Sequence, residues 1–338
     1  MAGIGGSVLT LVDHAKRIDP DGKVAKIAEM LNQTNRILDD AAFVEGNLPV
    51  GHRMTVRTSL PTPTWRQANQ GVAPTKSGTA QVDEQAGMLE SWSEVDKDIA
   101  ELNGNTYDFR LSEAKAFVQG MGQEMAGTLI YGNAGTAPAE FNGLATRYNS
   151  LSGVNAQNII SAGTVTGGDG TSIWLVGWSP ETVFMVYPKG SQAGLMHEDL
   201  GLVTVETTAG IAGNRMRAYQ DHWQWKLGLA VKDWRYAARI ANIDVSALKG
   251  DTAGSTVKLI EYMAQALDLL PELETVRPAF YMARTTSSLL RIQAMNKNTS
   301  AIEIQSGLQQ LGRPGQMSFL GVPIHTVDQI LGTESQVS

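Results

Sequence analysis

The longest run of helical periodicity lies between residues 107 and 133. Seven apolar side chains share one stripe there, namely Leu111, Ala114, Phe117, Val118, Met121, Met125 and Leu129. This spacing predicts a long amphipathic helix whose stripe faces a core. Gly120, Gly122 and Gly127 interrupt it, and each glycine inside a helix costs about 1 kcal/mol relative to alanine. We therefore expect another backbone to approach this helix closely.

Three other segments have helical spacing. Residues 22–43 carry a narrow, gapped apolar face, which suits a helix lying on a surface: Val24, Ile27, Ala28, Leu31, Ile37 and Leu38. Residues 255–273 carry a fuller stripe that Pro271 should end: Val257, Ile260, Met263, Leu267 and Leu270. Residues 285–296 predict a shorter helix.

Period-two alternation marks the strands. Met54, Val56 and Thr58 alternate with polar or charged neighbours, and residues 81–93 can form the returning strand of a long hairpin. Residues 172–190 predict two buried strands around a turn at Ser179–Pro180, and residues 202–243 predict strands around a Gly-rich loop. Residues 317–331 predict a strand pair hinged at Gly321. Helices and strands interleave without a regular βαβ rhythm, so the predicted class is α+β.

The expected hairpin has an unusual charge distribution. Residues 51–82 contain no acidic residue but carry Arg53, Arg57, Arg66 and Lys76. The next stretch is acidic and includes Asp83, Glu84 and Glu90. A hairpin with so few core-type residues is not stable alone, so we expect it to lie on another surface.

The composition of the chain argues against several classes of protein. The chain has 338 residues, 27 basic and 34 acidic, and a formal net charge of −7, which argues against a dedicated nucleic-acid binder. It has no cysteine, so disulfides and thiolate metal sites are excluded. No apolar run reaches the length of a membrane span, and the N-terminus lacks a convincing signal peptide. We expect a soluble protein made in a cytoplasm.

No catalytic motif stands out. The sequence lacks a phosphate-binding loop and a nucleophile elbow, and no two histidines have the spacing of metal ligands on a helix. The best metal or acid–base candidate is His197–Asp199, which an exposed loop explains equally well. Trp223 and Trp225 could form a sugar or base platform, but aromatic side chains alternating on a strand usually pack in a core.

A second acid-poor segment could contact nucleic acid. Residues 275–302 contain no acidic residue and carry Arg277, Arg284, Arg291 and Lys297. A solvated helix face explains this pattern equally well, so both interpretations stay open.

The order of elements and five stretches together resemble one family. The stretches are "IAEMLNQTNRILDDAAFVEGN", "IYGNAGTAPAEFNGLATRYN", "WLVGWSPETVFMVYPKG", "WKLGLAVKDWRYAARIANI" and "FLGVPIHTVDQI". The chain resembles the major capsid proteins of tailed double-stranded-DNA bacteriophages, with the Hong Kong 97 capsid fold, in the branch with short-tailed members.

The resemblance implies a division of the chain. Residues 1–45 would form an N-arm, residues 46–101 an extended loop, residues 102–149 and 312–338 a peripheral domain with its spine helix, and residues 150–311 an axial domain. It also implies hexamers and pentamers of this chain in an icosahedral virion head, assembled in the host bacterial cytoplasm.

The resemblance also implies partners. They are a scaffolding protein (unless the chain is already processed), a portal protein, a possible decoration or cement protein, and double-stranded DNA held non-specifically on the inner surface. No membrane, cofactor, metal or enzymatic activity is expected. Two alternatives stay open, an encapsulin-type compartment shell and a β-rich carbohydrate-active enzyme using Trp223, Trp225 and Asp221.

The hairpin supplies the candidate contact residues. We expect Arg53, Arg57, Arg66 and Lys76 to meet opposite charges on neighbouring copies, and the acidic group Asp83, Glu84 and Glu90 to do the same around a ring. One family member links a loop lysine covalently to an asparagine of a neighbour. Lys76 is in a polar tip where its amine should stay protonated, so we expect non-covalent shells. The alternative is that Lys76 becomes buried against a neighbour on maturation.

Overall fold

The computed structural model describes residues 35–102, 106–165, 168–206, 215–250, 257–297, 302–304 and 317–338. The predicted helix at 22–43 lies mostly outside these ranges, as does the Gly-rich loop after residue 206. The described chain forms two compact units. The first unit holds residues 88–125 and 194–226, and the second holds the rest.

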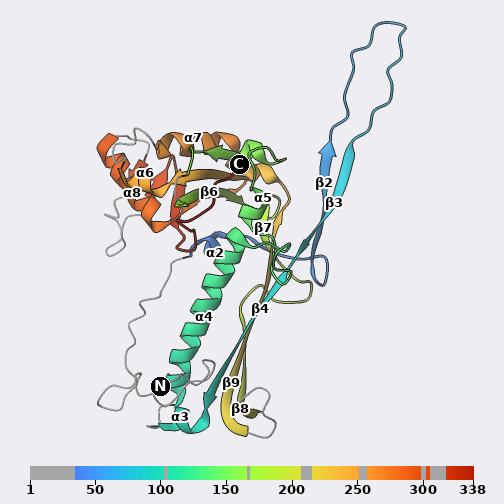
Figure 1. Ribbon diagram of the computed structural model, residues 1–338. Helices are drawn as coiled ribbons and strands as arrows, with labels where there is room; N and C mark the ends of the chain where they lie inside the picture. The colour runs from blue at the N-terminus through green and yellow to red at the C-terminus, as the bar shows by residue number, and fades with distance from the viewer. Residues whose placement is uncertain are drawn as a thin grey trace. The chain divides into compact units, whose positions relative to one another are not determined.

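The described part of the first unit combines helices α3 and α4 with strands β4, β8 and β9 (Figure 1). Its elements are β4 (Gly87–Asp96), α3 (Lys97–Glu101), the larger part of α4 (Thr106–Tyr131), β8 (Met196–Glu206) and most of β9 (Arg215–Val231). β8 pairs antiparallel with β9, from Met196 opposite Gln224 to Glu206 opposite Arg215. β4 is hydrogen-bonded to β9 as well. The predicted strands are thus confirmed, although the returning strand of the hairpin is broken at Ala86 into β3 and β4.

Helix α4 confirms the predicted helix but only part of its apolar stripe. Met121, Met125 and Leu129 are buried. Leu111 and Val118 were expected in the core, and this was wrong, because they are 43% and 44% exposed. The apolar face therefore meets a core over the C-terminal part of the helix and near Phe109.

The glycines of α4 do not mark a close backbone contact within the described chain. A Cβ at Gly120 or Gly122 would meet no atom within 4 Å, and one at Gly127 would meet only the side chain of Gln329. The described chain therefore supplies no close backbone contact at these three glycines.

The second unit is built on a mixed sheet (Figure 1). Its strands are β1 (Phe43–Glu45), β5 (Ile159–Ser161), β6 (Gly170–Trp178), β7 (Val183–Tyr187), β10 (Ala237–Asp244), β11 (Arg277–Met282), β12 (Ile302–Ile304), β13 (Met317–Phe319) and β14 (Val322–Thr326). β6 pairs antiparallel with both β10 and β11, and β11 pairs parallel with β14. Every residue of β6 is buried, as expected for a central strand between two covered faces.

Short helices surround this sheet. They are α2 (Ile37–Asp40), α5 (Leu144–Arg147), η2 (Ala156–Asn158), η3 (Trp234–Tyr236), α6 (Val245–Gly250), α7 (Leu259–Leu269) and α8 (Arg284–Lys297). Helix α7 ends at Leu269, and its extended C-cap residue Leu270 immediately precedes Pro271, which confirms the predicted stop. The predicted terminal strand pair is also confirmed. Leu320 and Gly321 both have positive φ, of 48° and 84°, in the two-residue turn between β13 and β14.

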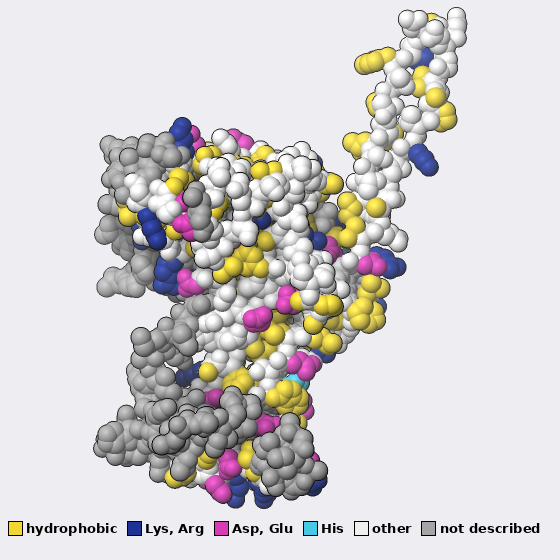
Figure 2. All heavy atoms as spheres, viewed as in Figure 1, with side chains coloured by type: hydrophobic (Ala, Val, Ile, Leu, Met, Phe, Trp, Pro, Cys, Tyr) yellow, Lys and Arg dark blue, Asp and Glu magenta, His cyan; other side chains and the backbone are white. Residues whose placement is uncertain are grey.

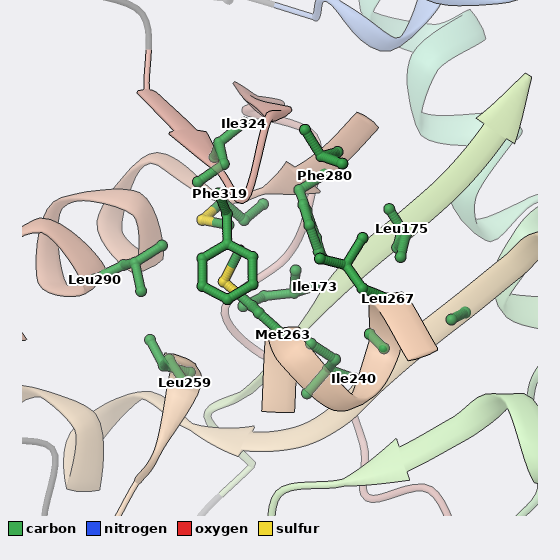
Figure 3. Packing of buried hydrophobic residues seen from close by; sticks show 14 of the residues in the cluster. Ile173, Leu175, Ile240, Leu259, Met263, Leu267, Phe280, Leu290, Phe319 and Ile324 are labelled. Atoms are coloured by element: carbon green, nitrogen blue, oxygen red, sulfur yellow. The ribbon is translucent and has the colours of Figure 1, made fainter. Parts of the chain in front are cut away.

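The main apolar core lies between the sheet and helices α7 and α8. Figure 3 shows side chains of these helices converging with those of β6, β10, β11, β13 and β14. Met263 of α7, Phe280 of β11 and Leu290 of α8 are fully buried there. Phe280 and Phe319 meet edge to face, with ring centroids 6.0 Å apart. Burying each such side chain contributes about 1.5–3 kcal/mol.

A buried polar cluster lies within the second unit. The guanidinium of Arg239 donates to Glu334 Oε2 at 2.8 Å, to Ser172 Oγ at 3.0 Å and to the Tyr148 carbonyl at 2.8 Å. The hydroxyl of Tyr131 donates to the other oxygen of Glu334 at 2.5 Å. Burial and the neighbouring carboxylate raise the pKa of Tyr131 far above its usual range. The charge of Arg239 is therefore compensated by a partner 95 residues later.

Strands β2 (Gly51–Ser59) and β3 (Gly78–Gln85) form a separate two-stranded sheet (Figure 1). They pair antiparallel from Gly51 opposite Gln85 to Ser59 opposite Gly78. The predicted long hairpin is confirmed. Residues 60–77 between the strands contain no helix or strand.

Candidate functional site

The hairpin is fixed at its foot by close backbone contacts. A Cβ on Gly51 would lie 2.0 Å from the Glu84 carbonyl oxygen, and a Cβ on Gly228 would lie 2.4 Å from the Gln85 carbonyl oxygen. Both distances are shorter than real contacts allow, so glycine is required where the hairpin meets β9. The amide of Ala86 also donates to the carbonyl of Val50 at 2.9 Å.

The tip of the hairpin is open to solvent. Trp65 is fully exposed, Leu60 is 72% exposed and Val72 is also exposed. Figure 2 shows apolar and basic side chains spread along this segment. Isolated exposed apolar residues are ordinary on a protein surface, but a tryptophan without any shielding offers a large area to a partner.

The structure pairs the first predicted contact residue within its own hairpin. Arg53 makes a two-pronged ion pair with Asp83, with both N–O distances at 2.6 Å. The hydrogen bond from Arg53 lowers the pKa of Asp83. These two residues lie opposite each other in the strand register, so their charges already compensate each other inside one chain.

Glu84 also has a partner in its own chain. Arg147 of α5 donates to both carboxylate oxygens of Glu84, at 2.6 and 2.7 Å, and Glu84 is only 8% exposed. Arg147 donates further to the Leu229 carbonyl at 3.0 Å. This pair ties the foot of the hairpin to the sheet of the second unit, and no sequence pattern indicated it.

Glu90 lies in the first unit, on β4. Its carboxylate accepts a hydrogen bond from Gln224 of β9 and lies 3.5 Å from His222 Nε2. By contrast, Arg57, Arg66 and Lys76 are exposed and form no salt bridge with the described residues. Of the seven predicted contact residues, these three basic ones have no charged partner among the described residues, so they are available for contacts with another copy of the chain.

The best catalytic candidate is a structural cluster. Residues 197–199 are exposed, as the alternative interpretation had it, but they lie in strand β8 rather than in a loop. His197 Nε2 is 3.0 Å from Asp221 Oδ1, and Arg110 of α4 contacts Asp221 and Asp199 at 2.9 and 2.7 Å. Hydrogen bonding from Arg110 lowers the pKa of Asp199. The described residues contain no group of three or more acidic or histidine side chains arranged to hold a metal.

The tryptophan platform is excluded by burial for Trp223. This side chain is 2% exposed and stacks on Phe117 of α4, with centroids 5.1 Å apart. A sugar or base therefore cannot reach its face, and the core-packing interpretation is confirmed for Trp223.

The acid-poor segment at residues 275–302 is partly neutralised. Arg284 forms a two-pronged pair with Asp328, at 2.6 and 3.1 Å, and Arg291 Nε lies 3.1 Å from the sulfur of Met317. Its basic character is thus smaller than the sequence indicates. Among the described residues, no helix is long and apolar enough to cross a membrane.

The fold belongs to a known class of viral shell proteins. The chain is similar to a chain in the near-atomic structure of bacteriophage Epsilon15, with a TM-score of 0.79 and 35% sequence identity over 100% of this chain and 99% of that one. The protein is α+β with the Hong Kong 97 capsid fold, as predicted.

The family follows from the sequence as well. Residues 19–338 match the family of the major capsid protein GP7. The chain belongs to this family, and it is a major capsid protein of a tailed phage head and a structural component of the virion. No curated protein matches the chain significantly.

More distant likenesses have lower scores. The capsid of a native GTA particle matches with a TM-score of 0.46 and 10% identity, over 66% of this chain and 95% of that one. The encapsulin complex from Synechococcus elongatus matches with a TM-score of 0.44 and 13% identity, over 70% and 97%. The family match therefore decides against the encapsulin alternative.

Proposed function

We propose that this chain builds the icosahedral head by repeated contact between copies in hexamers and pentamers, with the tip of the β2–β3 hairpin as one half of the contact. The observation that carries the proposal is the tip itself. Residues 60–77 have no regular structure, and they expose Trp65 with two basic side chains, Arg66 and Lys76, that the described chain leaves unpaired. A contact between two different surfaces of the same protein closes into rings and extends into a shell.

The proposal extends to the organisation of the chain. Residues 1–45 act as an N-arm, residues 46–101 as the extended loop, residues 102–149 and 312–338 as the peripheral domain, and residues 150–311 as the axial domain. Assembly takes place in the host cytoplasm with a scaffolding protein and a portal protein. A cement protein and non-specifically held double-stranded DNA complete the particle, and the chain has no enzymatic role.

Deleting the tip tests the contact. Ser59 lies opposite Gly78 in the register, so residues 60–77 can be replaced by Asn-Gly, which suits a two-residue hairpin turn. We expect a folded subunit, by circular dichroism, that builds no shells when co-expressed with the scaffolding protein. Normal shells in electron micrographs would reject the proposal, and so would loss of folding, because the tip would then belong to the core.

Charge reversal tests the basic residues. Arg57→Glu with Arg66→Glu should weaken assembly, and added salt should reduce the difference from the wild type, because exposed charges are screened. Arg53→Glu is the contrasting variant, because Arg53 already has a partner in its own chain. A salt-independent defect, or no defect, would show that Arg57 and Arg66 do not meet opposite charges.

The exposed position of Lys76 supports a non-covalent shell. Boiled particles should give a single band near 36.3 kDa on a denaturing gel. A ladder that Lys76→Ala abolishes would establish a covalent link instead.

A further inference from the structure

Beyond its foot, the hairpin β2–β3 has little cover from the described chain. In β2 only Gly51 and Met54 are buried, and in β3 only Glu84 is buried. Strand β2 has nine residues, which span about 30 Å. A rotation of about 10° at the foot would therefore move the far end of the strand by about 5 Å, which exceeds the distance over which two apolar side chains touch. The direction of the hairpin thus decides which partner its tip can reach.

One ion pair at the foot joins the hairpin to the body of the second unit. Arg147 donates to both carboxylate oxygens of Glu84 in β3, at 2.6 and 2.7 Å. The same guanidinium donates to the main-chain carbonyls of Asn142, at 3.2 Å, and of Leu229 in β9, at 3.0 Å. The side chain of Arg147 is 17% exposed and that of Glu84 is 8% exposed. A planar guanidinium with this many acceptors fixes the orientation of its partner as well as the distance.

Arg147 has a rigid support. It is the last residue of α5, and the start of this helix is bound to the end of α4. The amide of Gly143 and the hydroxyl of Thr146 both donate to the carbonyl of Gly132, at 2.8 and 2.6 Å. A Cβ on Gly143 would lie 2.6 Å from the Thr128 carbonyl oxygen, so the two backbones are in close contact. The position of the guanidinium is therefore fixed relative to α4.

The neighbouring contacts of the hairpin restrain its direction less. Gln85 Nε2 donates to the Glu140 carbonyl at 2.6 Å, but a single neutral hydrogen bond is weaker and less directional than a two-pronged ionic one. Arg53 and Asp83 form a two-pronged pair next to Glu84 in the strand register. Both of these residues belong to the hairpin, so their pair cannot set the direction of the hairpin relative to the body.

We propose that Arg147 is a positioning residue that sets the direction of the hairpin and, through it, the angle at which two copies meet. The inference rests on the proposed function, in which the tip is one half of the contact. The rotation between successive copies decides whether a ring of such contacts closes. A hairpin without a defined direction should therefore give contacts that fail to close. Arg147 acts here through Glu84 and not through a contact of its own with the neighbouring copy.

Distances between two spin labels, measured by pulsed electron spin resonance, test the direction. The chain has no cysteine, so Thr79→Cys in β3 and Thr275→Cys before β11, both at exposed positions, attach one label each. The test variant is Arg147→Met/Glu84→Gln, which removes the ionic fork without leaving a buried charge. In the unassembled full-length subunit, verified by sedimentation, its distance distribution should be about twice as wide as that of the wild type, because residue 79 moves by about 3 Å for a rotation of about 10°.

A matched control separates the position of the pair from its chemistry. Arg53→Met/Asp83→Asn removes a two-pronged pair of the same kind, and its distribution should keep the wild-type width. Arg147→Lys keeps the charge but loses the planar fork. It should also widen the distribution, which keeps the test decisive if the double variant folds poorly. Wild-type widths in both Arg147 variants, or equal broadening in the control, would overturn the role of Arg147.

Electron micrographs test the consequence for the shell. With co-expressed scaffolding protein, Arg147→Met/Glu84→Gln should give open or irregular particles, whereas Arg53→Met/Asp83→Asn should give regular shells. Regular shells from a subunit with broadened distances would overturn the link between hairpin direction and closure. The distances are measured without assembly, so they report on Arg147 even if deletion of the tip shows that the tip is not the contact.

Discussion

The hairpin β2–β3 and strand β6 belong to the same unit, yet they are stabilised in opposite ways. Every residue of β6 is buried between β10 and β11. In β2 only Gly51 and Met54 are buried, and beyond the strands the segment has no cover at all. The buried side chains of β6 stabilise the fold through contacts within the chain. The exposed tip makes few such contacts, so it can contribute free energy only to association with another copy. Substitutions in β6 and its neighbours should therefore act on folding, and those at the tip on assembly.

The largest effect is expected from breaking the buried ion pair of the sheet. Arg239→Met leaves Glu334 buried without its cation and should lower the free energy of unfolding by about 3–5 kcal/mol. Denaturant titration of the subunit measures this. Arg239→Met/Glu334→Leu should recover most of the loss, since neither charge then remains buried. A single variant as stable as the wild type would contradict the assigned role of the pair.

A smaller loss is expected where the hairpin meets the sheet. In Gly228→Ala the new methyl group would lie 2.4 Å from the Gln85 carbonyl oxygen, and overpacking of this kind costs about 1–3 kcal/mol. Gly78→Ala is the matched variant in β3, because its methyl group would meet only the flexible side chains of Thr58 and Ser59. Equal denaturation midpoints for the two variants would show that the foot is not held by this contact.

Acidification should destabilise the second unit through two histidines. Burial lowers the pKa of both His52, in β2, and His325, in β14, below 6.5. The folded state therefore binds fewer protons than the unfolded state. Its stabilisation is complete above about pH 6.5 and is lost as the pH falls through the lowered values. His325→Gln should reduce the acid sensitivity of the denaturation midpoint more than His52→Gln, because His325 is more deeply buried.

The smallest effect on folding is expected along the hairpin itself. Trp65 is fully exposed, and the Arg53–Asp83 pair is open to solvent. Trp65→Ala and Arg53→Ala should leave the denaturation midpoint of the subunit unchanged within error, because exposed pairs contribute little. Trp65→Ala should nevertheless reduce the yield of shells in electron micrographs. A clear drop in the midpoint for Trp65→Ala would place this side chain in a core.

Local periodicity explains which elements could be predicted from the sequence. The continuous apolar run of β6, the stripe of α7 and the positive-φ turn at Gly321 each depend on neighbouring residues, and all three are confirmed. The exposure of Leu111 could not be predicted, because helical spacing shows that residues share a face but not whether anything covers that face.

The same limit applies to the candidate contact residues, whose charges could be predicted from the sequence but whose partners could not. The opposite charges around the hairpin were visible in the sequence, but their partners depend on strand register and on distant segments. Arg53 faces Asp83 only because of the pairing of β2 with β3, and Glu84 meets Arg147 across 63 residues. The exposure of Trp65 likewise depends on the absence of cover in space, which composition alone does not show.

The buried position of Arg239 has a consequence for synthesis on the ribosome. Its partner Glu334 is made 95 residues later, which takes about 5–20 s at ordinary rates of translation. During that time the arginine lacks its carboxylate, and the apolar strand β6, made still earlier, lacks its neighbour β11 until residues 277–282 have been made. Long-range pairing of this kind slows folding and leaves apolar, aggregation-prone surface exposed to solvent in the meantime. We therefore expect the nascent chain to depend on chaperones until the residues near 334 have emerged.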